Sequence, residues 1–169
     1  MESARLLIRP MEAADKNAFV SGIADKTLRT AYGFPAEMAD DIASQIFQHF
    51  FGLNGTYTLA EKSSGEIIGF LLEVPPELPD EIRRGLPEKG KTLAYAVFPP
   101  FQRKGYMYEV LKAVIQQLFE TGIADYIHCG HFTENISSRE LLRRLGFQEY
   151  ASHRAGSRLV IDEILMRDR

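Results

Sequence analysis

Apolar side chains recur every three or four residues in several stretches of the chain, the pattern of a helix with one buried face. The longest such stretch covers residues 106–120, and Gly122 follows it as a helix stop. Further helices are expected over residues 12–24, 37–51 and 137–145. The apolar stripe of the segment 37–51 is interpreted as a core-facing surface.

Shorter apolar runs bounded by turn residues predict strands. These runs cover residues 5–9, 57–61, 66–74, 92–98, 125–131, 147–154 and 158–166. The turn Ser63-Ser64-Gly65 joins the second and third strands so tightly that they must be antiparallel. The helix over residues 106–120 lies between two strands, which predicts a crossover between parallel neighbours. The expected fold class is therefore α/β (α+β), a mixed and mostly antiparallel sheet of about seven strands with about four helices on its two faces.

The segment 75–90, PPELPDEIRRGLPEKG, interrupts this alternation. It is rich in proline, glycine and charge, which predicts a long loop with one helical turn near residues 80–84. Long loops in compact domains often carry function, but they are also tolerated as surface insertions. The sequence leaves both interpretations open.

Composition narrows the class of protein. The length of 169 residues fits a single domain over residues 1–169, and 45% apolar with 25% charged residues is typical of a globular chain. A net charge of -3 argues against a general nucleic-acid binder, which needs an excess of cations. No apolar run approaches the roughly 20 residues of a membrane span, and the N-terminus lacks the pattern of a signal peptide. The expectation is a cytoplasmic protein that contacts neither nucleic acid nor membrane.

Cys129 is the single cysteine, so no intramolecular disulfide can form, which suits a reducing compartment. His128 and His131 flank it on one short apolar run. This spacing is typical of a strand rather than of a zinc site, so no metal is expected. Cys129 itself is interpreted as a small buried hydrophobic residue rather than as a nucleophile.

A basic turn, VFPPFQRKGYM from Val97 to Met107, leads from a strand into the longest helix. The first N–H groups of a helix have no internal partner and lie at the positive end of its dipole, so they favour an anion such as a pyrophosphate. Gly105 lets the backbone approach the ligand, and Arg103 and Lys104 supply positive charge. The patterns G-x-x-x-x-G-K-[ST] and G-x-G-x-x-G are both absent. The residues alone therefore indicate an anion site without naming its ligand.

The same turn resembles the acetyl-CoA loop of the GNAT superfamily of N-acetyltransferases, whose pattern is V-x-P-x-x-Q/R-x-x-G-x-G/A. Val97, Pro99, Gln102 and Gly105 fall in register. Met107 departs from the pattern, because the family usually has glycine or alanine there.

Two further segments extend this resemblance over nearly the whole chain. The opening ARLLIRPMEAAD resembles the first strand and helix of the branch that acetylates the N-termini of ribosomal proteins. Residues 135–138 (NISS) and 141–147 (LLRRLGF) are similar to the family's N-x-x-S … L-G-F segment. The resemblance implies a sheet splayed between its fourth and fifth strands. It also implies acetyl-CoA as co-substrate and a primary amine, on a protein N-terminus or a small molecule, as the acceptor.

The resemblance also implies which residues bind the cofactor. They are Ala96, Val97, Phe98, Gln102, Arg103, Lys104, Gly105, Tyr106, Met107, Asn135 and Ser138. The backbone of residues 96–98 would pair with the pantetheine amides, and the N–H groups of residues 103–107 would hold the pyrophosphate. Asn135 would hydrogen-bond the cofactor arm. Asparagine is also a favoured helix N-cap, and the two roles are compatible.

For catalysis, the resemblance implies direct attack of the amine on the thioester without a covalent enzyme intermediate. Ser138 would stabilise or protonate the departing thiolate, although it also fits as an ordinary serine in the first turn of a helix. Leu142 stands where many members have a tyrosine acid. The N–H of Val97 would stabilise the oxyanion. The group that deprotonates the amine stays open between Glu73, Tyr95, His131 and water.

Two other interpretations remain. One is a non-catalytic acetyl-CoA-binding module, which Met107 and the missing tyrosine motivate. The other is a partner-binding domain that takes no cofactor. The sequence also leaves the oligomeric state open between a monomer and a homodimer.

Overall fold

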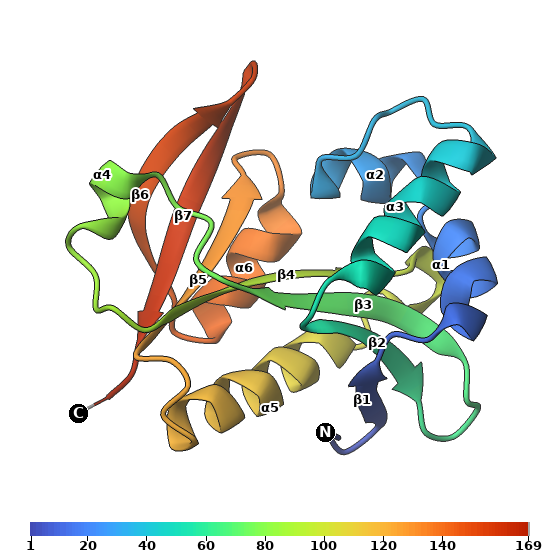
Figure 1. Cartoon of the computed structure of the whole chain (residues 1–169), viewed down its shortest axis with the longest axis horizontal. Helices are drawn as coiled ribbons and strands as arrows, with labels where there is room; N and C mark the ends of the chain where they lie inside the picture. The colour runs from blue at the N-terminus through green and yellow to red at the C-terminus, as the bar shows by residue number, and fades with distance from the viewer. Residues whose placement is uncertain (169) are drawn as a thin grey trace. The chain divides into compact units, whose positions relative to one another are not determined.

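In the computed structural model, which describes residues 1–168 and at Asp40 the backbone alone, seven strands pair in the order β1-β2-β3-β4-β5-β7-β6 (Figure 1). They are β1 (Leu6–Pro10), β2 (Thr56–Glu61), β3 (Ile67–Val74), β4 (Gly90–Val97), β5 (Tyr126–Phe132), β6 (Gln148–Ala155) and β7 (Arg158–Met166). β4 and β5 are parallel, whereas β1–β2, β2–β3, β5–β7 and β6–β7 are antiparallel. The predicted mixed, mostly antiparallel sheet of about seven strands is confirmed.

The described part of the chain has six α-helices rather than the four expected, and two short 3-10 helices. The α-helices are α1 (Lys16–Gly22), α2 (Lys26–Tyr32), α3 (Asp40–Gly52), α4 (Asp80–Arg83), α5 (Tyr106–Glu120) and α6 (Ile136–Arg144). The 3-10 helices are η1 (Ala13–Asp15) and η2 (Pro99–Phe101). The prediction for residues 106–120 matches α5 at both ends. α4 matches the helical turn expected near residues 80–84.

The main local error is α2, which the sequence analysis did not predict. Asp25 caps its N-terminus by accepting the N–H of Leu28 at 2.8 Å, and Gly33 ends it with a left-handed φ of 95°. The seven residues between these caps bury only Leu28. A helix with one buried residue has no apolar stripe, so periodicity could not reveal it.

The chain divides into two compact units, which are described separately below. Unit 1 consists of Met1–Leu72 and Tyr95–Leu111, and unit 2 of Glu73–Ala94 and Lys112–Arg169. β4 and α5 each contribute residues to both units. The expectation of a single domain over residues 1–169 stays a prediction.

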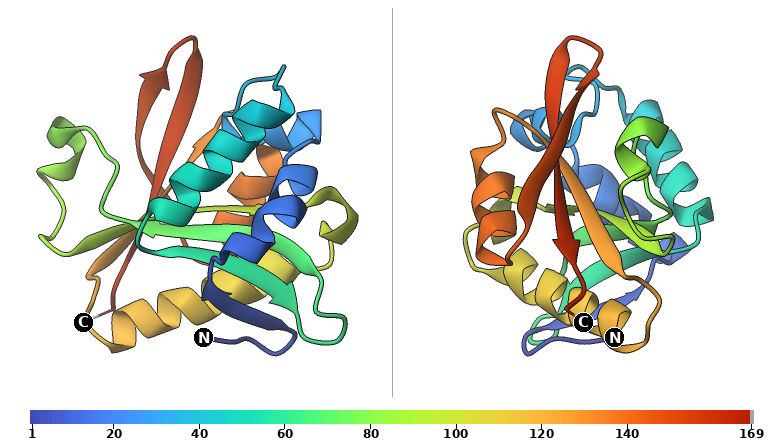
Figure 2. Two further views of the ribbon diagram at one scale, coloured as in Figure 1. Left: turned by 45° about the vertical axis from the view of Figure 1, so that its right-hand side comes forward. Right: turned by 90° about the vertical axis from the view of Figure 1, so that its left-hand side faces the viewer.

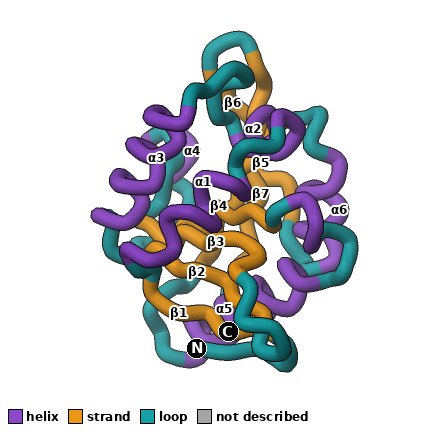
Figure 3. Tube along the Cα trace, turned by 90° about the vertical axis from the view of Figure 1, so that its right-hand side faces the viewer, coloured by secondary structure: helices purple, strands orange, loops and turns teal. Residues whose placement is uncertain are grey.

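Unit 1 is built around an aromatic cluster. β1, β2 and β3 run side by side, and α1 and α3 lie together on one side of them (Figure 3). The ring of Phe19 on α1 lies 5.6 Å from that of Phe47, 5.6 Å from that of Phe50 and 5.2 Å from that of Phe70, measured between centroids. Edge-to-face and tilted contacts of this kind add to the gain from burial. The predicted core stripe is thus confirmed at Phe47 and Phe50, whereas Ile42 of the same stripe is 38% exposed.

The opening segment folds around a buried carboxylate. Asp15 accepts two hydrogen bonds from the Arg9 guanidinium, at 2.7 and 2.8 Å. It also accepts the Thr58 hydroxyl at 2.6 Å and the N–H of Glu12 at 2.8 Å. Burial alone would raise the pKa of Asp15, but the hydrogen bonds from Arg9 and Thr58 outweigh it and lower that pKa. Asp15 therefore joins β1, β2 and the start of α1 as a charged group.

Unit 2 contains the long β6–β7 hairpin beside β5 (Figure 2). The parallel β4–β5 ladder pairs Gly90–Thr92 with Tyr126–His128, the first three residues of each strand. α6 packs on β5. The connection from β3 to β4 is anchored on this unit, because Leu78 is buried against Tyr126 and Ile164. The predicted long loop is therefore held by an apolar contact.

Candidate functional site

The predicted anion-binding turn belongs to unit 1 and has an unusual backbone. Arg103 has a left-handed φ of 62°, and Gly105 one of 78°. α5 begins at Tyr106, and its first backbone hydrogen bond runs from the N–H of Glu109 to the Gly105 carbonyl at 3.2 Å. The N–H groups of residues 103–107 therefore precede the helical ladder. Successive N–H groups in such a turn form a concavity that suits an anion.

The open space around Gly105 also suits an anion at this turn. A Cβ built on this glycine would find only the Arg5 Nη2 atom within ordinary contact distance, at 3.7 Å. The positive φ, rather than crowding, is what favours glycine here. Met107 is buried, at 7% exposure, so the larger side chain that departs from the family pattern points away from solvent.

The exposed side chain of Gln102 bonds back to the end of β4. Its Nε2 donates to the Val97 carbonyl at 2.9 Å, which ties the start of the turn to the end of β4. Lys104 lies with its ammonium 5.4 Å from the centre of the Phe101 ring. The side chains of Arg103 and Lys104 are exposed, so both can contribute charge to an anion at this turn.

The end of β4 offers one backbone donor on the side away from β3. The N–H of Phe98 donates to the Ile68 carbonyl of β3 at 2.8 Å, and its carbonyl accepts the N–H of Phe101 at 2.9 Å. Both backbone groups of Phe98 are thus engaged within unit 1. Because N–H directions alternate along a strand, the N–H of Val97 points away from β3. This is the direction that the predicted oxyanion role requires.

In unit 2, Asn135 and Ser138 lie together at the start of α6. The Asn135 Oδ1 atom accepts the N–H of Ser138 at 3.1 Å, so Asn135 is the N-cap of this helix. Both residues are half-buried. Leu142, one turn further on, is fully buried and cannot act as an acid.

Two of the candidate bases already have partners. The Glu73 carboxylate forms a 2.9 Å ion pair with Lys91. Both ring nitrogens of His131 are bonded, Nδ1 to the Phe132 carbonyl at 3.0 Å and Nε2 to Glu163 at 2.8 Å. Either side chain would have to leave its partner before it could accept a proton from an amine. Tyr95 is half-buried on β4.

The interpretation of Cys129 as a buried residue is confirmed. It is 1% exposed, and burial, together with the nearby Glu163 carboxylate, raises the pKa of its thiol. Among the side chains that the structure describes, no group of His, Cys, Asp and Glu is arranged to hold a metal ion. None of the helices described is both long and apolar enough to span a bilayer.

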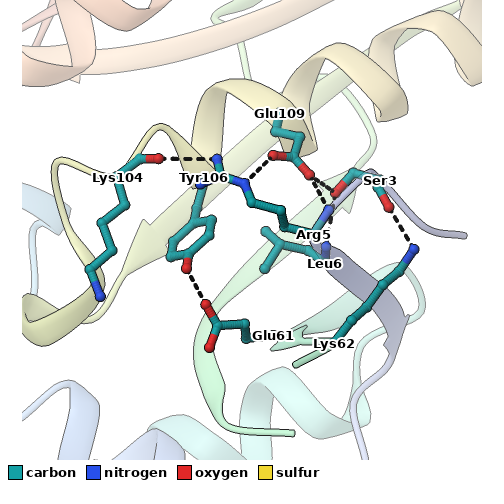
Figure 4. Close-up of polar contacts among 8 residues, drawn as sticks. All are labelled: Ser3, Arg5, Leu6, Glu61, Lys62, Lys104, Tyr106 and Glu109. Atoms are coloured by element: carbon teal, nitrogen blue, oxygen red, sulfur yellow. Dashed lines mark hydrogen bonds and ion pairs between the residues drawn. The ribbon is translucent and has the colours of Figure 1, made fainter. Parts of the chain in front are cut away.

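Sequence reasoning missed three charged residues beside the turn, namely Arg5, Glu61 and Glu109. The Tyr106 hydroxyl donates to Glu61, and the Arg5 guanidinium donates to Glu109 at 2.9 Å (Figure 4). Arg5 and Glu109 are 104 positions apart, so no local motif links them. Only the proximity of β1 to the start of α5 reveals this group.

Solved structures of known acetyltransferases share this fold. A GNAT-family acetyltransferase from Bacillus anthracis matches with a TM-score of 0.82 and 14% identity, over 99% of this chain and 98% of the other. The ribosomal-protein-S5-alanine acetyltransferase from Vibrio fischeri matches with a TM-score of 0.71 and 15% identity, over 99% and 96%. The spermidine N-acetyltransferase from Vibrio cholerae, solved with CoA and spermine, matches with a TM-score of 0.74 and 13% identity, over 97% and 96%. At such identities the likeness shows the fold.

The family follows from the sequence itself. The model of the acetyltransferase (GNAT) domain matches residues 5–148, which include the turn from Val97 to Met107 and the segment with Asn135 and Ser138. This match covers most of the chain, and the mixed sheet with a parallel β4–β5 pair agrees with it. The chain therefore belongs to the GNAT family of acetyltransferases.

Proposed function

We propose that this protein transfers an acetyl group from acetyl-CoA to a primary amine, by direct attack in a ternary complex. The observation that carries the proposal is the turn between β4 and α5, whose left-handed Arg103 and Gly105 precede a fifteen-residue helix. A pyrophosphate fits such a turn because it receives N–H groups, the positive end of a helix dipole and two cationic side chains. Family membership and the relative solved with CoA and spermine support the same assignment.

In this proposal, different residues bind different parts of the cofactor. The N–H groups of residues 103–107 face the pyrophosphate, and Arg103 and Lys104 offset its charge. Gln102 holds the Val97 carbonyl and so fixes the end of β4. Val97 directs its backbone groups away from β3 and offers them to the pantetheine arm, whereas those of Ala96, like those of Phe98, point toward β3. Asn135, already the N-cap of α6, is the further polar contact to that arm.

The chemistry then needs few groups. Acetyl-CoA supplies the thioester whose acetyl group is transferred. The N–H of Val97 donates to the carbonyl oxygen as negative charge develops there. As the amine nitrogen bonds to the acetyl carbon and the C–S bond breaks, the Ser138 hydroxyl donates a hydrogen bond that stabilises the departing thiolate. Because Glu73 and His131 are held in ion pairs and hydrogen bonds, proton removal from the amine through water requires the least rearrangement.

The acceptor is proposed only as a class. A protein N-terminus and a small-molecule polyamine are both primary amines. A ribosomal-protein-S5-alanine acetyltransferase and a spermidine N-acetyltransferase both share the fold. The two classes are separated by screening N-terminal peptides and polyamines for release of CoA thiol.

Acetyl-CoA should raise the melting temperature, because a ligand that binds only the folded state stabilises it. At 100 times its dissociation constant the gain is about 2.7 kcal/mol. CoA should act similarly and ATP much less, since ATP lacks the pantetheine arm. No shift at millimolar acetyl-CoA would contradict the proposal. A shift without thiol release for any amine would favour a non-catalytic acetyl-CoA-binding module.

Replacing Ser138 with alanine should lower kcat about a hundredfold, the lower range for loss of a hydrogen-bond donor to a developing negative charge, while KM for acetyl-CoA changes little. The measurement is thiol release with the best amine from the screen. Ser137→Ala is the matched control, because Ser137 is the exposed neighbour on the same helix turn. Equal kcat values in the two variants would show that Ser138 is only a first-turn serine.

A further inference from the structure

The Arg5 side chain, at the entry to β1, bonds to two parts of the turn and helix that follow β4 (Figure 4). Its Nη2 donates to the Lys104 carbonyl at 3.0 Å, inside the turn. Its Nε donates to Glu109 Oε2 at 2.9 Å, and its backbone N–H donates to Glu109 Oε1 at 2.7 Å. One residue therefore connects the first strand to both the turn and the first turn of α5.

Neighbouring groups hold this arrangement in place. The Ser3 hydroxyl donates to Glu109 Oε1 at 2.5 Å, so both carboxylate oxygens have donors. The Arg5 guanidinium also lies 4.4 Å from the centre of the Tyr106 ring, a cation–π contact. The hydroxyl of Tyr106 donates in turn to Glu61 at the end of β2.

The bond to Lys104 sets the direction of an N–H group. The carbonyl of Lys104 and the N–H of Gly105 belong to one planar peptide unit and point in opposite directions. Arg5 draws the carbonyl toward β1, so the N–H of Gly105 is directed away from Arg5. Gly105, which has a left-handed φ and no Cβ, leaves one side of this peptide unit easy to rotate, so the bond from Arg5 helps to fix its direction.

The bond from Arg5 to Glu109 offsets a negative charge beside the turn. Burial alone would raise the pKa of Glu109, but the hydrogen bonds from Ser3 and Arg5 outweigh it and lower that pKa. Glu109 is therefore a carboxylate in the first turn of α5. Without a cation beside it, this charge would oppose an anion at the turn. Arg5 offsets it.

We propose that Arg5 is a positioning residue for the pyrophosphate-binding turn, which it orients through the Lys104 carbonyl and shields from the charge of Glu109. This inference rests on the proposed use of acetyl-CoA. Arg5 acts on the turn and not on the reacting thioester. Its effect is therefore confined to donors that carry a pyrophosphate.

The test compares acetyl-CoA with S-acetylpantetheine, a donor that lacks the pyrophosphate and the nucleotide. In Arg5→Ala, KM for acetyl-CoA should rise about tenfold with kcat nearly unchanged, the size expected for one charge-assisted hydrogen bond. The kcat/KM for S-acetylpantetheine should stay within about twofold of the wild-type value. Arg5→Lys keeps the charge without the two-pronged geometry and should show a smaller rise in the acetyl-CoA KM.

Lys62→Ala is the matched control for charge. Lys62 also lies beside β1, where its ammonium contacts Glu2 at 2.9 Å and the Ser3 carbonyl at 2.7 Å, and neither of these partners belongs to the turn. The Lys62→Ala variant should keep the wild-type kinetic constants with both acetyl-CoA and S-acetylpantetheine. In Arg5→Ala/Glu109→Gln, loss of the unshielded carboxylate should restore part of the affinity for acetyl-CoA.

Two outcomes would overturn the inference about Arg5, and a third would contradict the proposed function as well. If a folded Arg5→Ala protein lost kcat/KM equally with both donors, Arg5 would have a general structural role. An unchanged KM for acetyl-CoA in both Arg5 variants would show that the turn orients itself. A wild-type protein inactive with both donors and unshifted by CoA would instead refute the proposed function.

Discussion

Replacing Asp162 with alanine is expected to lower the free energy of unfolding by about 3 kcal/mol, the upper end of the range for leaving a buried hydrogen-bonding group without its partner. Asp162 is fully buried on β7. One of its oxygens lies 3.0 Å from His128 Nε2, and the other lies 2.7 Å from His153 Nδ1. His128 is itself buried, and its Nδ1 lies 2.8 Å from the Thr92 hydroxyl.

The cost arises because the centre of the network, formed by Asp162, His128 and Thr92, is buried away from water. The Thr92 hydroxyl also accepts the N–H of Glu77 at 2.9 Å, so the chain of bonds runs from the 75–90 segment to β6. Without Asp162 the His128 Nε2 loses its acceptor in a buried site, and an unsatisfied polar group is costly. We expect the 75–90 segment to become more accessible to proteases as a result.

Urea denaturation measures the change, with an unaltered m-value as the sign that the folded state is otherwise intact. Asp125→Ala is the control, since Asp125 forms an exposed pair with Arg167 at 3.6 Å in the same unit. Such a pair is worth about 1 kcal/mol or less. If Asp162→Ala and Asp125→Ala lost similar free energies of unfolding, the buried network would not stabilise the protein as predicted.

The same carboxylate predicts the direction of the pH dependence. Burial alone would raise the pKa of Asp162, but hydrogen bonds from His128 and His153 outweigh it and lower that pKa. A lowered folded-state pKa stabilises the protein above the ordinary pKa of aspartate, about 4, and this stabilisation is lost as the pH falls through the lowered value. The stability advantage of the wild type over Asp162→Asn should therefore shrink below about pH 4.

Replacing Gly69 with alanine should lower the free energy of unfolding by about 3 kcal/mol, at the upper end of the overpacking range. An alanine Cβ at this position of β3 would overlap the Ala96 carbonyl oxygen of β4. It would also lie 3.1 Å from the Ala96 carbonyl carbon and 3.1 Å from Val97 Cα. These are backbone atoms, so relief requires the end of β4 to move.

That movement gives the substitution a second readout. Val97 is the residue whose backbone is proposed to meet the pantetheine arm. In Gly69→Ala the thermal shift with acetyl-CoA should therefore be smaller than in the wild type. Gly52→Ala is the matched control, because no atom lies within 4 Å of its added Cβ, and its stability should change by less than about 1 kcal/mol. If Gly69→Ala changed the free energy of unfolding as little as Gly52→Ala, then β3 and β4 would not approach each other as closely as described.

The candidate site was predictable where it is contiguous in the sequence. The turn from Val97 to Met107 carries its proline, glycine and cations within eleven residues, and its preference for an anion follows from local backbone chemistry. The role of Gln102 was not predictable in this way. The sequence assigned it to the cofactor, and the structure adds a bond from its side chain to the Val97 carbonyl.

By itself the sequence determined the strands, the limits of α5 and the place of the turn that is proposed to bind an anion, because alternation, helical periodicity and turn residues act over a few positions. It did not reveal α2, which buries a single side chain. Only the tertiary structure decided that Arg5 and Glu109 meet beside the turn, and that Asp162 joins His128 to His153. Such contacts depend on which strands pair and on which faces are buried, and those choices are made by packing over the whole unit rather than by neighbouring residues.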